Sequence, residues 1–404
     1  MSKPIIIFVA LMAGLLIGIV AGGAGAVTVA DVIGTMWLNA LRMTVIPLVV
    51  SLLITGIVQT AAAARAGRLA ARAVAMMLSV LVCSSILAAV MIPLLFSLIP
   101  MPAGAGDALR AALVTTAKPG DVAPFGDFLR AIIPTNPIAA AANDAILPLI
   151  IFTAAFAFAT TRLPDTQRQT IGGFFEAITA AMIVVIHWVL ALAPIGVFAL
   201  SFVVGAKAGA AAFGALAHYV LILSSLGVII WAFSFLFARV GGGIGVARFF
   251  RASLPAQAVA ISTQSSLASL PAMVEGVKSL GVPVATAEIT LPLAVAIFRA
   301  TGPAMNLGVA LYIVHWFGFE PTALQIAAGI AAGATTTLGA VSLPGQVSFF
   351  SSIVPICLAL GVPIEPLGLL IAVETFPDIF RTLGNVTMDM ALTTTVARHD
   401  GADA

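Results

Sequence analysis

The sequence predicts an all-α polytopic membrane protein, and two observations carry this prediction. Of the 404 residues, 61% are hydrophobic and only 8% are charged, whereas soluble domains contain about 25% charged residues. The apolar residues also form long runs, at 5–21, 74–99, 181–206 and 217–238. Each run reaches the roughly 18–20 residues that a spanning helix needs. Helices rather than a barrel therefore form the spans.

The first run, residues 5–21, follows Lys3 and ends in small residues, as a secretory signal does. Its apolar part is as long as a full span, which favours a retained first helix over a cleaved signal. Cys83 and Cys357 both lie in apolar segments, without the spacing of a metal site or a disulfide. We expect them to be packing residues, with no bound metal and no cofactor.

Arginines cluster in three connections between the apolar runs. The clusters are Arg65, Arg68 and Arg72; Arg162 and Arg168; and Arg239, Arg248 and Arg251. The positive-inside rule places all three in the cytoplasm, which requires an even number of crossings between them. The runs 74–99 and 138–160 supply two crossings, and 181–206 and 217–238 supply two more. The acidic, Gly/Pro-rich loop at 100–127 then falls outside the cell.

Two segments in the second half are too polar for lipid-facing helices. Residues 253–283 and 331–363 share a plan of Ser/Thr, small residues and then Leu-Pro. Both are typical of segments that enter the membrane and turn back, which is tolerated only where the backbone is buried or lines a cavity. Two interrupted segments in corresponding positions indicate a transporter's binding site. The alternative is a pair of marginal spanning helices with polar interfaces.

The stretch between these two segments contains a charge among apolar residues. Arg299 lies in the middle of the nearly apolar residues 291–314, and Gly302-Pro303 follows it. A charge at this depth must face a partner, a cavity or a substrate. The Gly-Pro pair indicates a helix that is interrupted beside a binding site.

The last apolar segment, residues 369–398, carries most of the polar groups. Six of them fall inside a stripe of about 100° on one helix face: Glu374, Asp378, Arg381, Thr382, Asn385 and Asp389. Six polar groups on one intramembrane face exceed what packing needs, which favours substrate or ion handling over a structural ion pair. Pro377 removes one backbone donor and is expected to disturb the first turn of this face.

Together these motifs resemble the dicarboxylate/amino acid:cation symporters, a family that includes bacterial and mammalian glutamate transporters. The resemblance rests on residues 42–59, 132–152 and 193–200, and on the motifs SSLASLP, TLPLAVAI and DIFRTLGNVTMD. It implies eight transmembrane helices, two re-entrant hairpins, inverted repeats and an elevator-type homotrimer in which a transport domain slides against a scaffold. A multi-pass protein of the cell inner membrane is expected, surrounded by the lipid bilayer and without a nucleic-acid partner.

The resemblance also divides the chain into regions. These are 1–73 (scaffold helices 1 and 2), 74–99 (third helix, transport domain), 100–127 (extracellular loop), 128–216 (scaffold helices 4 and 5), 217–251 (sixth helix, transport domain), 252–395 (transport core with hairpin 1, helix 7, hairpin 2 and helix 8) and 396–404 (cytoplasmic tail).

Site residues carry over from the family one position at a time. In the last helix, Asp378 matches the residue that holds the substrate amine and Arg381 the one that pairs with the side-chain carboxylate. Thr382 and Asn385 match two further substrate contacts, and Asp389 matches an aspartate that helps to bind sodium.

Both hairpin tips also have counterparts in this sequence. Ser265 and Ser266 match the serine-rich tip of the first hairpin, although Leu267 follows them. Ser342 and Gly345 lie in the tip of the second hairpin, which gates the site from outside in the family.

The chain departs from the family at the Asn-Met-Asp-Gly-Thr motif of helix 7, which supplies oxygen ligands to sodium. The aligned residues are Phe298, Arg299, Ala300, Thr301 and Gly302. Sodium, like calcium, is a hard cation that needs oxygen ligands, and the Asn and Asp side chains are gone. Our hypothesis is that Arg299 replaces sodium as a tethered cation.

In this hypothesis Arg299 pairs with Asp389 or Glu374, and the co-transported cation is H⁺ rather than Na⁺. Glu374, Asp378 and Asp389 are then the candidate proton carriers, because a partly desolvated carboxylate can titrate near neutral pH. Two alternatives stay open. Arg299 is a structural partner in a sodium-coupled protein, or it binds a second carboxylate of the substrate.

The function expected is a secondary-active symporter that imports a small anionic solute, above all glutamate or aspartate. In the family, dicarboxylate carriers lack the amine-binding aspartate, so Asp378 favours an amino acid. A C4-dicarboxylate or neutral amino-acid symporter is the alternative, and a ligand-gated anion channel or sensor represents a different class. The scattered residues His187, His218, His315 and His399 lack the spacing of an enzyme motif.

Overall fold

The computed structural model describes residues 3–65, 67–102, 104, 106, 133–339 and 345–402, and within these ranges the chain is helical, without strands. The helices are α1 (Lys3–Ala21), α2 (Ala24–Arg42), α3 (Val45–Ala64), α4 (Arg68–Leu98), α7 (Pro137–Ala142), α8 (Ile146–Thr160), α9 (Asp165–Ala191), α10 (Ala193–Ala208), α11 (Ala211–Val240), α12 (Val246–Thr263), α13 (Ser266–Ser279), α14 (Val284–Ile297), α15 (Thr301–Phe317), α16 (Ala323–Gly339), α17 (Gly345–Leu360), α18 (Leu367–Val373) and α19 (Thr375–Ala402). The predicted all-α class is confirmed.

Six segments in this part of the chain are long and apolar enough to cross a membrane. They are Pro4–Ala21, Ala24–Ala64, Arg68–Leu98, Asp165–Ala191, Ala211–Val240 and Val284–Phe317. The chain is therefore a polytopic membrane protein by length and composition. The acidic loop predicted at 100–127 lies almost wholly outside the described residues.

One predicted span has different bounds in the structure. The apolar run 181–206 is divided at Leu192, where α9 ends and α10 begins. Pro194 stands in the first turn of α10, where the missing N–H of proline costs little, whereas in a helix interior it would break a backbone hydrogen bond. Two helices therefore replace the single predicted one.

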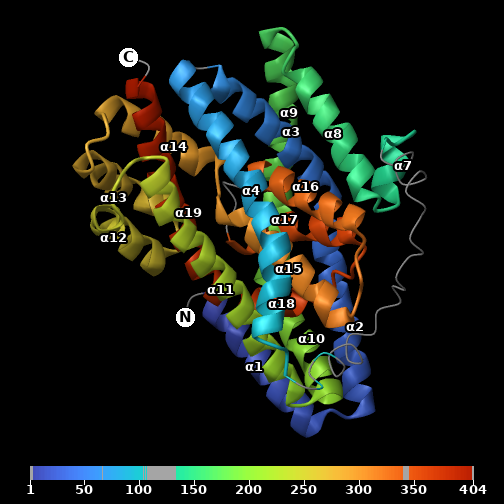
Figure 1. Ribbon diagram of the computed structural model, residues 1–404. Coiled ribbons are helices and arrows are strands. Elements are labelled where there is room, and N and C mark those ends of the chain that lie inside the picture. The colour runs from blue at the N-terminus through green and yellow to red at the C-terminus, as the bar shows by residue number, and fades with distance from the viewer. Residues whose placement is uncertain are drawn as a thin grey trace.

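The first two arginine clusters, and Arg239 of the third, lie at one end of the molecule. Arg65 donates to the carbonyl of Thr161 at 2.7 Å, which joins the first cluster to the second. Arg72 approaches Asp400 of α19 at 3.7 Å, and Arg398 donates to the carbonyls that end α11. In Figure 1 the α3–α4 and α8–α9 connections lie at the same end as the C-terminus.

Two hydrophobic clusters form the interior. The smaller cluster collects residues of α4, α11–α14 and α19, and the larger one collects residues of α1–α3, α7–α10 and α15–α18 with parts of α4 and α11. Helices α12 and α13 pack against each other as a hairpin, as do α16 and α17. Figure 1 shows α12 and α13 beside α19, away from α1, α2 and α10.

Candidate substrate site

The break between α14 and α15 is the first element of the site. Helix α14 ends at Ile297 and α15 begins at Thr301. Backbone groups freed by a break need partners inside a membrane. The Thr301 N–H donates to Asn385 Oδ1 at 2.9 Å, and the carbonyl of Ala300 accepts from the Ser84 hydroxyl of α4. Side chains from two other helices therefore stabilise the interruption.

The predicted interruption is confirmed, but it lies before Gly302-Pro303 and not at that pair. Both residues belong to the first turn of α15. Proline is tolerated there because a helix start has no intrahelical acceptor for its N–H. The break itself consists of Phe298, Arg299 and Ala300.

The second element is the junction between α18 and α19. Glu374 lies between the two helices, and Pro377 falls in the first turn of α19. The Asp378 N–H still donates to the Glu374 carbonyl at 2.9 Å. The segment is divided at Glu374, three residues before Pro377, so the first turn of the predicted face is interrupted there, whereas Asp378 to Asp389 share one uninterrupted helix.

Arg381 is the centre of the polar contacts. It is buried, and its guanidinium donates to the Glu374 carboxylate and to Asn306 Oδ1 at 2.6 Å, while its Nε forms an ion pair with Asp378 at 3.3 Å. A buried guanidinium needs partners of this kind, because an unpaired charge in an apolar interior is very costly. The predicted face thus brings Glu374, Asp378 and Arg381 together.

Helices α11 and α15 add Tyr219 and Asn306, which the sequence analysis did not identify, and Thr301, which it named only within the family motif. The hydroxyl of Tyr219 donates to Glu374 Oε2 at 2.8 Å. Asn306 holds Arg381, and the Thr301 hydroxyl lies 2.9 Å from the Arg381 carbonyl and 2.8 Å from Asn385 Oδ1. The sequence did contain one signal for Asn306, because an Asn in the apolar run of α15 needs a polar partner.

A small cavity lies between these groups and the second hairpin. It is lined by Arg299, Ser348, Phe349, Glu374, Asp378 and Arg381, and its volume is about 10 Å³. Arg299 is half-buried and donates to the Ser348 hydroxyl of α17 at 3.2 Å. A space of this size holds about one water, so in this conformation the cavity has no room for an amino acid.

Asp389 lies deeper in α19 and has no exposed surface. Among the described residues neither of its carboxylate oxygens has a hydrogen-bond partner. The predicted pairing of Arg299 with Asp389 is therefore not a hydrogen bond in this structure. The other predicted partner, Glu374, is held by Arg381 and Tyr219.

The remaining predicted site residues lie on α19, in the first hairpin (α12–α13) and in the second hairpin (α16–α17). Thr382 and Asn385 are buried on α19, and Asn385 already accepts from Thr301. Ser265 caps α13 by accepting from the Ala268 N–H at 3.2 Å, and Ser266 begins that helix.

The tip of the first hairpin reaches the site region. Gln264, in a left-handed conformation (φ 51°), donates to the Thr375 carbonyl at 3.2 Å. In the second hairpin Gly345 begins α17, one turn before Ser348. Ser342 lies outside the described residues.

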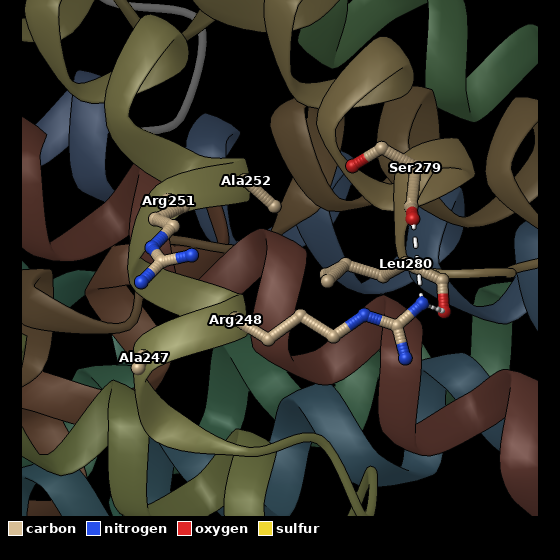
Figure 2. A pocket seen from close by; sticks show the side chains of 6 residues that line it. All are labelled: Ala247, Arg248, Arg251, Ala252, Ser279 and Leu280. Atoms are coloured by element: carbon tan, nitrogen blue, oxygen red, sulfur yellow. Dashed lines mark hydrogen bonds between the residues drawn. The ribbon is translucent and has the colours of Figure 1, made fainter.

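A larger cavity of about 490 Å³ lies between α12 and α13. Figure 2 shows Arg248 reaching across it to the carbonyls of Ser279 and Leu280, at 3.5 and 3.2 Å, while Arg251 points away from that contact. Arginine at a helix end stabilises the last carbonyls, so Arg248 closes α13. No group of three or more His, Cys, Asp or Glu residues in the described ranges could hold a metal ion.

Comparisons with known proteins find relatives over almost the whole length of this chain. The model of a family described as the sodium:dicarboxylate symporter family matches residues 4–399. The proton/glutamate-aspartate symporter of Escherichia coli (strain K12) is 26% identical over 379 residues, 91% of this chain and 84% of that protein. The proton/sodium-glutamate symport protein of Bacillus subtilis (strain 168) is 25% identical, over 98% of this chain and 92% of that protein. The C4-dicarboxylate transport protein of Solibacter usitatus (strain Ellin6076) is 26% identical, over 98% and 91%.

Proposed function

The chain belongs to the sodium:dicarboxylate symporter family, and from this premise we propose that it is a secondary-active symporter that imports an acidic amino acid with a cation. The observation that carries the proposal is the pair Asp378 and Arg381, one turn apart on α19 and lining one cavity. The carboxylate suits a substrate amine, and the planar guanidinium suits a side-chain carboxylate. The protein is a transporter of the cell inner membrane and not an enzyme.

Two substrate classes follow from the names of the relatives, which are glutamate-aspartate and C4-dicarboxylate carriers. Asp378 favours the amino acid, because a dicarboxylate has no amine to neutralise this acid. A specific observation supports the second class, since Arg299 lines the same cavity as Arg381. Two guanidinium groups suit a solute with two carboxylates.

For the coupled cation we propose the proton, with Arg299 in place of sodium. Relatives include both proton and proton/sodium carriers. The α14–α15 break offers Phe298, Arg299 and Ala300, whose side chains lack the oxygen ligands that a hard cation needs. The guanidinium also repels Na⁺ from the cavity.

The proposed architecture has eight spans, formed by α1, α2–α3, α4, α7–α8, α9–α10, α11, α14–α15 and α18–α19. The hairpins α12–α13 and α16–α17 are then the re-entrant segments. The smaller hydrophobic cluster, which joins α4, α11–α14 and α19, supports the proposed transport domain. The inverted repeats, the homotrimer and the elevator movement are proposed from the family resemblance.

Uptake of labelled aspartate into proteoliposomes tests the function and its coupling. We expect accumulation under an inward proton gradient in Na⁺-free buffer, and no further gain from an inward Na⁺ gradient. Strict dependence on Na⁺ would contradict the role of Arg299, while the failure of every ion gradient to drive accumulation would contradict the symporter itself.

The substrate class is tested by thermal stabilisation with aspartate, glutamate, serine and succinate, because binding stabilises only the folded state. We expect aspartate or glutamate to stabilise the wild type most. Asp378→Asn should weaken aspartate binding by about tenfold or more, as expected for the loss of one charge-assisted hydrogen bond, and should leave succinate binding in place. If succinate stabilises the wild type more than aspartate does, the dicarboxylate alternative is correct.

A further inference from the structure

Tyr219 lies on α11, outside the elements that supply the proposed substrate contacts. Its side chain is fully buried, and its hydroxyl donates to Glu374 Oε2 at 2.8 Å. Its ring packs edge-to-face on Tyr312, with ring centres 5.2 Å apart. A buried tyrosine hydroxyl needs a polar partner. Here that partner is the acid that holds Arg381.

The hydrogen bonds of Arg381 leave a defined set of donors for a ligand. A guanidinium has five N–H donors in a rigid plane. Arg381 donates from one terminal nitrogen to Glu374 and from the other to Asn306 Oδ1 (2.6 Å), while Nε forms an ion pair with Asp378 (3.3 Å). Among the described residues, one N–H on each terminal nitrogen therefore has no hydrogen-bond acceptor, and a carboxylate accepts two N–H groups in a bidentate contact.

The orientation of these two N–H groups depends on Glu374, which lines the cavity, and on Tyr219 and Asn306, which do not. Glu374 Oε1 accepts from Arg381, while Oε2 accepts from Tyr219. Because the carboxylate is held at both oxygens, it cannot rotate without losing a bond. Asn306 of α15 holds the opposite terminal nitrogen of Arg381. The guanidinium plane is thus fixed from α11 on one side and from α15 on the other.

We propose that Tyr219 and Asn306 are positioning residues that set Arg381 for the side-chain carboxylate of the substrate. This inference rests on the proposed function. It adds to that function, because affinity for the acidic side chain of the substrate then depends on residues of α11 and α15 as well as on α19. Loss of either residue frees the guanidinium to turn, so that a bidentate contact becomes a weaker single one.

The test compares two ligands that differ in the side-chain carboxylate, L-aspartate and L-serine, in the purified full-length protein. Tyr219→Phe keeps the ring and its contact with Tyr312 but removes the hydroxyl. We expect the Kd for aspartate to rise about tenfold, as for loss of one hydrogen bond to a charged group. The Kd for serine, measured by competition, should change by less than about twofold.

Tyr312→Phe is the matched control. It removes a hydroxyl from the same aromatic cluster, but that hydroxyl contacts His218 and the Ala215 carbonyl rather than Glu374. Its Kd for both ligands should stay within about twofold of wild type. Asn306→Ala provides an independent route to the same result if Tyr219→Phe does not fold, because it removes the other partner of Arg381.

Three outcomes decide the proposal. A selective loss of aspartate affinity supports it. An equal loss for both ligands indicates a merely structural role and overturns it, as does an unchanged Kd for aspartate. If wild-type protein binds no aspartate, the proposed function fails first, which distinguishes that failure from a failure of the positioning role.

Discussion

Helices α1 and α10 approach each other through glycines, whereas α15 and α19 are joined through amide and charged side chains. On α1, a Cβ added to Gly18 would lie 2.2 Å from the Phe202 carbonyl oxygen of α10. On α10, a Cβ at Gly205 would lie 2.3 Å from the Leu15 carbonyl oxygen of α1. Small residues at such spacing let two backbones touch in a membrane.

The contact between α15 and α19 depends on different chemistry. Asn306 and Thr301 of α15 hold Arg381 and Asn385 of α19. The first contact is selected by size and carries no charge, while the second keeps charges buried at the cost of desolvation. A larger side chain in the α1–α10 contact should therefore lower stability by overpacking and leave substrate binding intact. Loss of a polar side chain in the α15–α19 contact should instead weaken substrate binding. Three substitutions test this difference.

The largest effect is expected for Arg381→Met. It leaves Glu374 and Asp378 without their cation, and breaking a buried pair costs about 3–5 kcal/mol. We expect the free energy of unfolding in detergent to fall by this amount and aspartate binding to be lost. Arg168→Met is the control, because the partner Asp165 has 80% of its side chain exposed and surface pairs contribute about 0–1 kcal/mol. Aspartate affinity that survives Arg381→Met would refute the site.

Gly18→Ala should have an intermediate effect on stability. The added methyl group overlaps the backbone of α10, and overpacking of this kind costs about 1–3 kcal/mol. The Kd for aspartate of the folded fraction should equal that of wild type, since the site lies elsewhere. Gly25→Ala on α2, where no atom lies within 4 Å of the new methyl group, should instead stabilise by up to about 1 kcal/mol. A raised Kd in Gly18→Ala would show that the two contacts are coupled.

Thr301→Val should have the smallest effect of the three. It removes a buried hydroxyl that contacts the Arg381 carbonyl and Asn385, and one neutral hydrogen bond contributes about 1 kcal/mol. We expect a lower melting temperature in thermal unfolding. Ser79→Ala is the control and should change the melting temperature little, because the Ser79 hydroxyl is exposed and donates to the Ala75 carbonyl of its own helix. An unchanged melting temperature in Thr301→Val would mean that the break is stabilised by other groups.

The sequence predicted the parts of this molecule that follow from local periodicity. The spacing of Asp378, Arg381 and Asn385 places them on one face whatever surrounds the helix, and the charge of Arg299 identifies a site because a lone cation in an apolar run needs a partner. The polar face and the interrupted helix are therefore both present in the structure, where Asp378 and Arg381 meet Glu374.

Contacts between distant elements could not be predicted in this way. Tyr219 and Glu374 are separated by 155 positions, and nothing in the apolar run around Tyr219 indicates which acid it reaches. Asn306 is similarly 75 positions from Arg381. The division of the run 181–206 at Leu192 was missed for another reason, because hydropathy does not register the proline that starts α10.

The small volume between Arg299 and Arg381 has a consequence for the form in which a cation can occupy the site. At about 10 Å³, the site has room for roughly one water molecule and none for a hydrated ion. A proton needs no such space, because it resides on a carboxylate oxygen. In this conformation the cavity therefore suits a cation held on a side chain and excludes one that keeps its water shell.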